Sequence, residues 1–286
     1  MTLYRFEQIE EKIINIIGQL IVDLRNDYFE EYVLLIARAD YNKNIGDIQC
    51  DTTPYDFYNL QQFARDETRE KFMIEYINRF KYRLTNQTTL SDACIEYDIN
   101  IQLMIYSHVW ESQMMLKTLR RIASIINNNG YEWRILFTKE NGAFLPRNQF
   151  IENSILKPLK EQRQDLYKLL CTAYNSNLRN DFSHSDYLIK VKDRTIISYE
   201  TEGCAYKQQL SFEEWNEIFV KSILLSYYLQ KIIDERLQNY TKDESPKPVN
   251  VKVPYRSNPN EKILCSIEPY YDESIGFYRF RYYNIK

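Results

Sequence analysis

Apolar side chains recur every three or four residues over long stretches of this chain, and glycine and proline seldom interrupt them. The 286 residues include only 6 glycines and 8 prolines, the two residue types least favourable inside a helix. The repeat is clearest from Leu3 to Leu24 and from Ile101 to Ile126, where its spacing is that of an amphipathic helix. The sequence therefore predicts a mainly α fold.

Helix-start and helix-stop signals place further helices along the chain. Thr53-Pro54 has the residue types of a helix cap and first turn, and Ser211-Phe212-Glu213-Glu214 is a capping box. A helix should stop at Asn127-Asn128-Asn129-Gly130, because Asn and Gly tolerate left-handed dihedral angles. The expected helices are 3–24, 28–39, 54–84, 100–126, 151 to about 178, and 212–239.

Short segments with alternating apolar residues predict small β elements. Asn141-Gly142 is expected to form the turn of a hairpin over 133–145, and 187–199 should form a second hairpin. Three alternating segments between 249 and 283 indicate a β-rich end of the chain. The predicted organisation is an N-terminal helical region over 1–95, a helical bundle over 96–240 and a β-rich C-terminal tail over 241–286.

Charge and cysteine content limit the partners that the chain is expected to have. The net charge is −3, so charge-driven, nonspecific binding of nucleic acid is not expected. An RNA-cleaving enzyme with a small local basic pocket is compatible with this charge. The five cysteines are far apart and odd in number, which predicts neither a disulfide framework nor a zinc site. The apolar run Ile13–Val22 is about half as long as a membrane span. We expect a cytoplasmic protein outside the membrane, with no metal and no cofactor.

Histidine is scarce in this chain, which contains only His108 and His184. A His-rich metal site and an HExxH protease are excluded, and the scattered glycines form neither a phosphate-binding loop nor the Gly-x-Ser-x-Gly elbow of a hydrolase. His108 falls on the apolar face of its predicted helix, so we expect a core or interface residue. His184 lies in a polar, turn-prone stretch that follows a long predicted helix.

The sequence around His184 forms a motif, Arg179-Asn180-Asp181-Phe182-Ser183-His184. Leu24-Arg25-Asn26-Asp27 nearly repeats residues 178–181 without a histidine, so the histidine carries the signal. The motif resembles the Arg-x(4–6)-His motif of the HEPN superfamily, which has ribonuclease members in phage-defence and toxin systems. The resemblance covers about 100–239. It implies a HEPN-like helical bundle, metal-independent RNA cleavage and a symmetric homodimer with a composite active site.

The chemistry of the motif residues agrees with this expectation. An imidazole group titrates near pH ~6.5 and transfers protons readily at neutral pH, and a guanidinium group is a permanently charged fork for phosphoryl oxygens. Arg179 and His184 are therefore candidate catalytic residues, and Asn180 is expected to orient the imidazole or the RNA. The further candidate contacts to RNA are Ser183, Tyr187 and Lys190.

The spacing of the motif sets a geometric condition. On a continuous helix, residues five apart point in different directions, whereas Asn180 and His184, four apart, share a face. Arg179 and His184 can therefore converge only if the helix ends between them, or if a second subunit supplies one of the two.

Two other functions stay open at the level of sequence. One is a non-catalytic HEPN module that binds nucleotide or protein partners, and the other is a structural helical interaction protein. A binding module does not need an acid–base pair, so the presence of both Arg179 and His184 favours the enzyme. HEPN toxins that are silenced by a nucleotidyltransferase partner tend to have the pattern His-x-Tyr. In this chain the tyrosine, Tyr187, lies one residue further from His184, so a nucleotidyltransferase partner is not predicted. An antitoxin or other regulatory partner, the RNA that is cut and the activating trigger stay open.

Overall fold

The chain is mainly helical, with small antiparallel sheets, in agreement with the predicted class. A computed structural model describes residues 1–41, 55–57, 60–86, 90–138, 142–143, 145–199, 206–242, 248–254, 262–274 and 276–283. The helices are α1 (Leu3–Asp27), α2 (Phe29–Ile36), α3 (Leu60–Thr85), α4 (Asp92–Glu111), α5 (Gln113–Ile126), α6 (Arg147–Phe150), a π-helix (Ile151–Leu156), α7 (Lys157–Gln162), α8 (Gln164–Ala173), α9 (Ser176–His184) and α10 (Phe212–Lys242).

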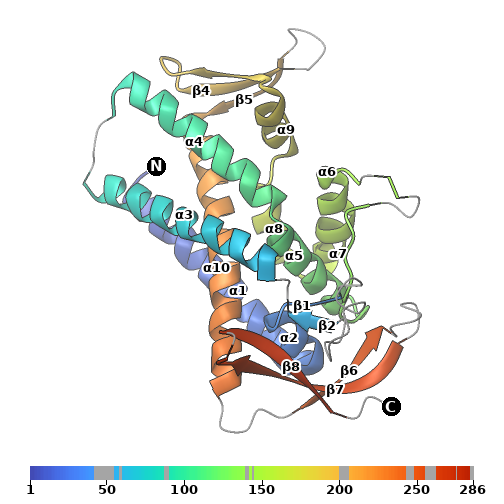
Figure 1. The fold of residues 1–286 in the computed structure, drawn as a ribbon. Coiled ribbons are helices and arrows are strands. Elements are labelled where there is room, and N and C mark those ends of the chain that lie inside the picture. The colour runs from blue at the N-terminus through green and yellow to red at the C-terminus, as the bar shows by residue number, and fades with distance from the viewer. Residues whose placement is uncertain are drawn as a thin grey trace.

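Helix α10 runs through the middle of the molecule and organises the core (Figure 1). The predicted capping box starts it: the Ser211 N–H donates to Glu214 Oε2 at 2.8 Å, and the Glu214 N–H donates to Ser211 Oγ at 3.2 Å. Helix α1 packs along α10. Trp215 and Phe219 of α10 are completely buried, Trp215 against Tyr106 of α4 and Phe219 against α3. One continuous cluster of buried side chains extends from α1 to the last strand, and the boundaries expected at 95 and 240 stay predictions.

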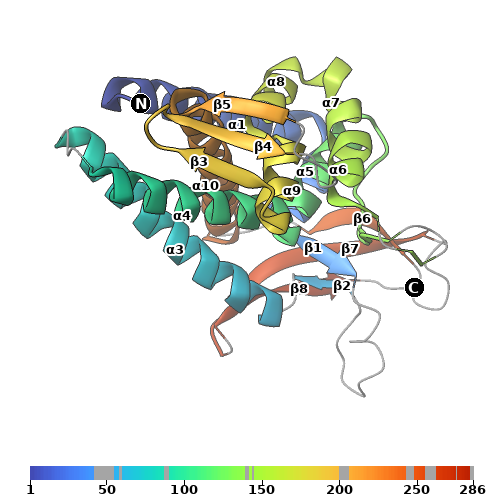
Figure 2. The same ribbon diagram turned by 90° about the horizontal axis from the view of Figure 1, so that it is seen from above.

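Two three-stranded antiparallel sheets lie toward opposite ends of α10 (Figures 1 and 2). The predicted hairpin over 187–199 is confirmed, with Leu188 opposite Ile197, and a strand that the sequence did not predict, β5, completes its sheet. The alternating segments at the end of the chain form the second sheet, as predicted. The strands are β1 (Ala39–Tyr41), β2 (Tyr55–Phe57), β3 (Tyr187–Lys190), β4 (Thr195–Tyr199), β5 (Tyr206–Ser211), β6 (Val249–Pro254), β7 (Lys262–Asp272) and β8 (Phe277–Tyr283).

The predicted long helix over 100–126 is wrong in one respect, because the chain forms two helices there. The first of them, α4, begins at Asp92, earlier than predicted. The helical path breaks at Ser112, whose backbone is extended (φ −60°, ψ 113°), before α5 begins. The Ser112 hydroxyl accepts a hydrogen bond from the Met115 N–H and so caps α5. The stop at the asparagine run is confirmed, since Asn128 and Gly130 both have positive φ. The break matters for the site because it ends α4 at Glu111.

Three other sequence predictions need correction. The helix expected from residue 54 begins at Leu60, because 55–57 pair with β1 as strand β2; Thr53-Pro54 lie outside the described residues. Residues 133–137 form no strand, although the Leu145 N–H donates to Phe137 O at 3.1 Å, and the expected turn at Asn141 lies outside the described part of the chain. The helix expected over 151–178 is divided into three helical segments, the π-helix, α7 and α8, and the start of α9.

Candidate functional site

The motif occupies a short helix of its own, α9, which begins after a sharp change of chain direction. Asn175 caps α9, because its Oδ1 accepts hydrogen bonds from the N–H groups of Asn177 (3.1 Å) and Leu178 (3.2 Å). The hydroxyl of Tyr106, a fully buried residue of α4, accepts a hydrogen bond from the Asn175 N–H at 2.6 Å. The start of α9 is therefore fixed to α4.

The inward face of α9 holds it against α4 and β4. Leu178 and Asp181 are both buried. The Asp181 carboxylate accepts a hydrogen bond from the Ser198 hydroxyl on β4, and its backbone carbonyl accepts one from the Asp186 N–H at 2.8 Å. Ser185, with φ +60°, ends the helix directly after His184. These contacts fix the direction in which the other face of α9 presents its side chains.

Arg179 is part of a cluster of charged side chains from three helices. Its guanidinium group pairs with the carboxylate of Glu111, the last residue of α4, and the other oxygen of this carboxylate lies 3.1 Å from Nε of Arg147 on α6. The side chains of Arg179 and Arg147 are 18% and 9% exposed, whereas that of Glu111 is 39% exposed. The Arg147 guanidinium also lies over the Phe137 ring, 3.7 Å from its centre. We call Glu111, Arg147 and Arg179 the arginine cluster.

The arginine cluster has the electrostatic properties of an anion site. Its two guanidinium groups and one carboxylate give it one net positive charge. Burial lowers the pKa of both arginines from the usual value, because desolvation penalises the charged form. Two of their N–H groups, at Arg179 Nε and Arg147 Nη1, are buried and have no acceptor among the described residues. The net positive charge is what attracts a phosphate group, whereas the two buried N–H groups have no accessible surface for it to contact.

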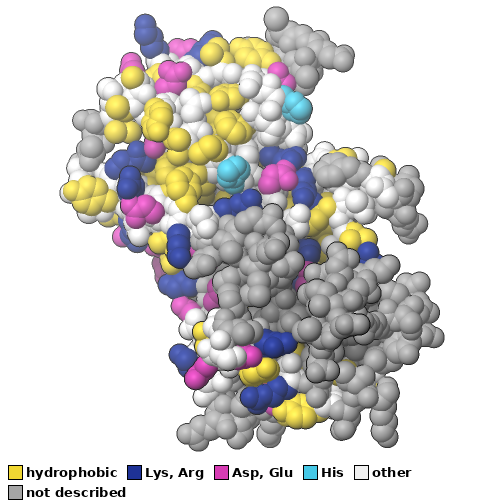
Figure 3. All heavy atoms as spheres, in the orientation of Figure 1, with side chains coloured by type: hydrophobic (Ala, Val, Ile, Leu, Met, Phe, Trp, Pro, Cys, Tyr) yellow, Lys and Arg dark blue, Asp and Glu magenta, His cyan; other side chains and the backbone are white. Residues whose placement is uncertain are grey.

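Both histidines are exposed, and both are visible on one face of the molecule (Figure 3). His184 is the last residue of α9, and His108 lies on α4, three residues before Glu111 and so on the same side of that helix. Acidic and basic side chains lie beside them in Figure 3, next to a group of apolar side chains. His108 was expected in the core or in an interface. Its exposure shows that it is not a core residue, and its place in an interface stays a prediction.

Helix α9 continues unbroken from Arg179 to His184. A helix end between the two residues, one of the two conditions under which their side chains could converge, is therefore absent. With 3.6 residues a turn, positions five apart on one helix point roughly 140° apart. Arg179 points to Glu111 on α4, while His184 is exposed at the C-terminal end of α9. Within the described chain, the two groups do not face each other.

The remaining candidate residues have partners within the protein. The Asn180 Oδ1 accepts a hydrogen bond from Arg179 Nη1 at 3.1 Å, so this amide orients the arginine. Ser183 donates to the Arg179 carbonyl at 3.0 Å. Tyr187 donates to Asn100 Oδ1 at 2.6 Å, which ties β3 to α4 and engages the hydroxyl in the fold. The side chain of Lys190 is 42% exposed and its Nζ lies 4.0 Å from the Asp193 carboxylate, so it is still accessible to a phosphate.

Sequence reasoning missed Glu111 and Arg147. Both lie far from the motif along the chain, and no local pattern marks them, since Glu111 ends an ordinary amphipathic helix and Arg147 follows an irregular segment. The one available signal was the position of Glu111 three residues after a histidine. Their part in the site follows only from the packing of α4 against α9 and from the ion pair of Arg147 on α6 with Glu111.

No family model matches this chain, and no curated protein or solved structure matches it either. Among the described residues, no helix is long and apolar enough to cross a membrane. The same part of the chain contains no group of three His, Cys, Asp or Glu side chains placed to hold a metal ion. What the site can do must therefore be argued from its own geometry.

Replacing Glu111 by alanine should lower the free energy of unfolding by about 1–3 kcal/mol, because two mostly buried guanidinium groups then face each other without their anion. Urea denaturation followed by circular dichroism measures this loss. Glu75→Ala is the matched control: it removes an ion pair with Arg79 in which both side chains are more than half exposed, so the expected loss is about 0.5 kcal/mol or less. Equal losses in the two variants would contradict the arginine cluster as described.

Proposed function

We propose that this protein is a metal-independent endoribonuclease of HEPN type, belonging to a defence or toxin system. The observation that carries the proposal is the arrangement of the motif on α9. Its arginine lies in a cluster with excess positive charge, and its histidine is exposed at the end of the same helix. The resemblance of Arg179–His184 to the HEPN motif adds the reaction class.

The proposed reaction is attack of a ribose 2′-oxygen on the adjacent phosphorus. The arginine cluster binds the phosphoryl oxygens and stabilises the charge that builds up on them. An imidazole removes the 2′-hydroxyl proton as the new P–O bond forms, and a second acid gives a proton to the 5′-oxygen as the old P–O bond breaks. The products are a 2′,3′-cyclic phosphate and a free 5′-hydroxyl, so the step uses no water and no metal.

A symmetric homodimer supplies the missing second group in this proposal. One motif contains one histidine, and Arg179 and His184 diverge on the unbroken helix α9. Two-fold symmetry places a second motif opposite the first without any new sequence. On α4, the exposed side chain of Tyr97 and the partly exposed side chains of Ile101 and Met104 lie at helical spacing on the side that carries His108. This apolar stripe beside the motif is the surface that we assign to the partner copy.

The alternative is a non-catalytic module that binds a nucleotide or a protein partner, and one contact favours it. The guanidinium group of Arg179 is already paired with Glu111, as expected if this arginine only supports the fold. Glu111 is the most exposed of the three side chains of the arginine cluster, so an incoming phosphate can share or displace it. An antitoxin or regulatory partner that covers the same face would silence either function.

Metal chelation tests the reaction class. RNA cleavage by the purified protein should persist in excess EDTA, because arginine and imidazole groups perform each step. The fragments should end in 2′,3′-cyclic phosphate and 5′-hydroxyl groups, which mass spectrometry of a short synthetic RNA identifies. A parallel reaction with added Mg²⁺ is the control. Activity that disappears with EDTA and returns with Mg²⁺ would indicate a carboxylate site in place of the proposed one.

A further inference from the structure

A pocket opens between α1, α8 and α10. Helices α1 and α8 pack against α10 on the side away from α4 (Figures 1 and 2). The charged residues that line this pocket are all basic: Arg5 and Lys12 on α1, Lys168 on α8 and Lys221 on α10. The rest of the lining consists of Gln8, Thr172 and the apolar residues Ile9, Ile13 and Leu169. We call this the basic pocket.

The helical period of α1 places its part of the lining on one face. Arg5, Gln8 and Lys12 are separated by three and then four residues, so their side chains lie above one another along the helix. Ile9 and Ile13 belong to the same face and are buried in the core. The apolar period that fixes α1 in the fold therefore also fixes the positions of its basic side chains at the pocket.

The basic pocket carries three net positive charges, in a chain whose net charge is −3. The Glu217 carboxylate on α10 accepts hydrogen bonds from Arg5 Nε at 2.8 Å and from Lys221 Nζ at 3.2 Å, so one anion serves two cations. Lys12 and Lys168 are exposed, and neither has a salt bridge within the described part of the chain. Like charges that are held together repel each other, and a bound anion would relieve this repulsion.

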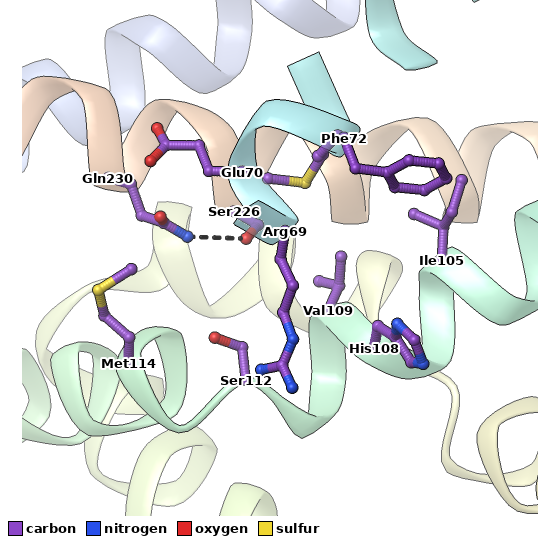
Figure 4. Close-up of a pocket in the computed structure, with 11 residues that line it drawn as sticks. Arg69, Glu70, Phe72, Ile105, His108, Val109, Ser112, Met114, Ser226 and Gln230 are labelled. Atoms are coloured by element: carbon purple, nitrogen blue, oxygen red, sulfur yellow. Dashed lines mark hydrogen bonds between the residues drawn. The ribbon is translucent and has the colours of Figure 1, made fainter. Parts of the chain in front are cut away.

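The pocket between α3, α4, α5 and α10, drawn in Figure 4, lacks such an excess of charge. Its lining includes His108 and one residue of each fixed charge, Arg69 and Glu70. Gln230 Nε2 donates to Ser226 Oγ at 3.4 Å, so two further lining residues bond to each other. Of these two pockets, the basic pocket is the one whose charge suits a ligand with several negative charges.

We propose that the basic pocket binds a compact ligand that carries at least two phosphate groups, such as a free diphosphate or triphosphate. This inference goes beyond the proposed function and does not rest on it. Lysine ammonium groups bind phosphate oxygens as point charges, and a guanidinium group binds them as a fork. Two or more phosphates in one ligand match the net charge of the pocket, whereas a single phosphate neutralises only part of it.

The surroundings of the basic pocket favour a compact ligand over an RNA strand. The adjoining hollow shares Thr172 and Lys221 with the basic pocket, but its lining also contains Glu213, Glu214 and Glu217. Glu11 is exposed beside Lys12 on α1. An extended phosphate backbone would meet these carboxylates, because RNA binding usually follows a continuous basic stripe. A compact ligand keeps its charge within the pocket.

Calorimetric titration of the full-length protein with sodium tripolyphosphate tests the inference without using catalysis. Lys12→Gln and Lys168→Gln should each lower the affinity about 5-fold and together about 25-fold, because one exposed charge contact contributes about that much. The matched control combines Lys160→Gln and Lys242→Gln, which remove two exposed lysines outside the pocket. It should change the affinity less than about 2-fold at physiological salt, which screens distant charges. Equal losses in the two double variants, or no binding to the wild type, would overturn the inference.

Melting curves show whether the two lysines serve a ligand or the fold. The ligand-free Lys12→Gln, Lys168→Gln protein should melt at the wild-type temperature or higher, because the change removes mutual repulsion. Tripolyphosphate should raise the melting temperature of the wild type clearly more than that of this variant. A lower melting temperature of the ligand-free variant would contradict the excess of repulsion on which the inference rests.

Further ligands identify the source of the phosphate groups. ATP presents three phosphates, as tripolyphosphate does: equal affinities mean that the phosphates alone are bound, and tighter binding of ATP means that the nucleoside adds contacts. Both results support the proposal. AMP, with one phosphate, should bind at least about 10-fold more weakly than ATP. If only a non-cleavable 2′-O-methyl oligonucleotide responds to the changes at Lys12 and Lys168, the pocket is an RNA surface and the inference is wrong. No readout uses cleavage, so failure of the ribonuclease assignment would leave this inference standing.

Discussion

Replacing His184 by alanine should lower RNA cleavage at least ~100-fold while the protein stays folded, because general acid–base groups typically contribute that much. The side chain is exposed at the C-terminal end of α9, so its removal leaves no cavity. Initial rates at equal concentration of folded protein measure the effect, with circular dichroism and melting curves to verify the fold. Tyr82→Ala is a suitable control, because it removes another exposed ring, on α3.

The arginine of the motif should respond in a graded way. Arg179→Ala removes the phosphate fork and should lower cleavage by a similar factor, while Arg179→Lys keeps the charge and should restore it only in part. Arg179 also pairs with Glu111, so its variants require rates per folded molecule. Wild-type cleavage by a well-folded His184→Ala protein would remove the assignment of His184, whatever the arginine variants show.

The fold was predictable where a local pattern determines it. Helices α1 and α10 and strands β3, β4, β6, β7 and β8 follow from apolar period and caps, because one face of each element is buried. The break at Ser112 was not predictable, because the apolar spacing continues across it and serine is common inside helices as well as at caps. Strand β5 was missed because its central Gln208-Gln209 gives no alternation of apolar and polar residues.

The site was predictable only in its local part. The motif marks Arg179 and His184 because they are close in sequence, and no feature of the local sequence relates them to Glu111 and Arg147. The ion pairs of Glu111 with Arg179 and Arg147 arise from long-range packing. Helix α4 ends at Glu111, with Ser112 as its C-cap, and α6 starts after Pro146. The same packing brings His108 to the face that carries the motif (Figure 3), although its helix period indicated a core or interface position.

Mixing two inactive variants should restore cleavage if the active site is shared between subunits. In a heterodimer of Arg179→Ala and His184→Ala, one intact arginine faces one intact histidine, and random exchange of equal amounts makes half of the dimers mixed. In those, one site has an arginine facing a histidine but lacks the second imidazole, so the recovered activity should be measurable but well below a quarter of the wild type. Light scattering should give twice the chain mass of 34.6 kDa, and such an interface buries about 1,200–2,000 Å².

The rival arrangement places the second proton-transfer group in the same chain, and His108 is the side chain that would provide it. It is exposed on the same face as His184 and lies three residues before Glu111. In that case His108→Ala alone should lower cleavage ~100-fold, and mixtures of the Arg179 and His184 variants should stay inactive. Recovery in the mixture, together with a clearly smaller effect of His108→Ala, is the result expected for the symmetric dimer. A monomer with full activity would exclude the shared site, although the ribonuclease assignment would stand.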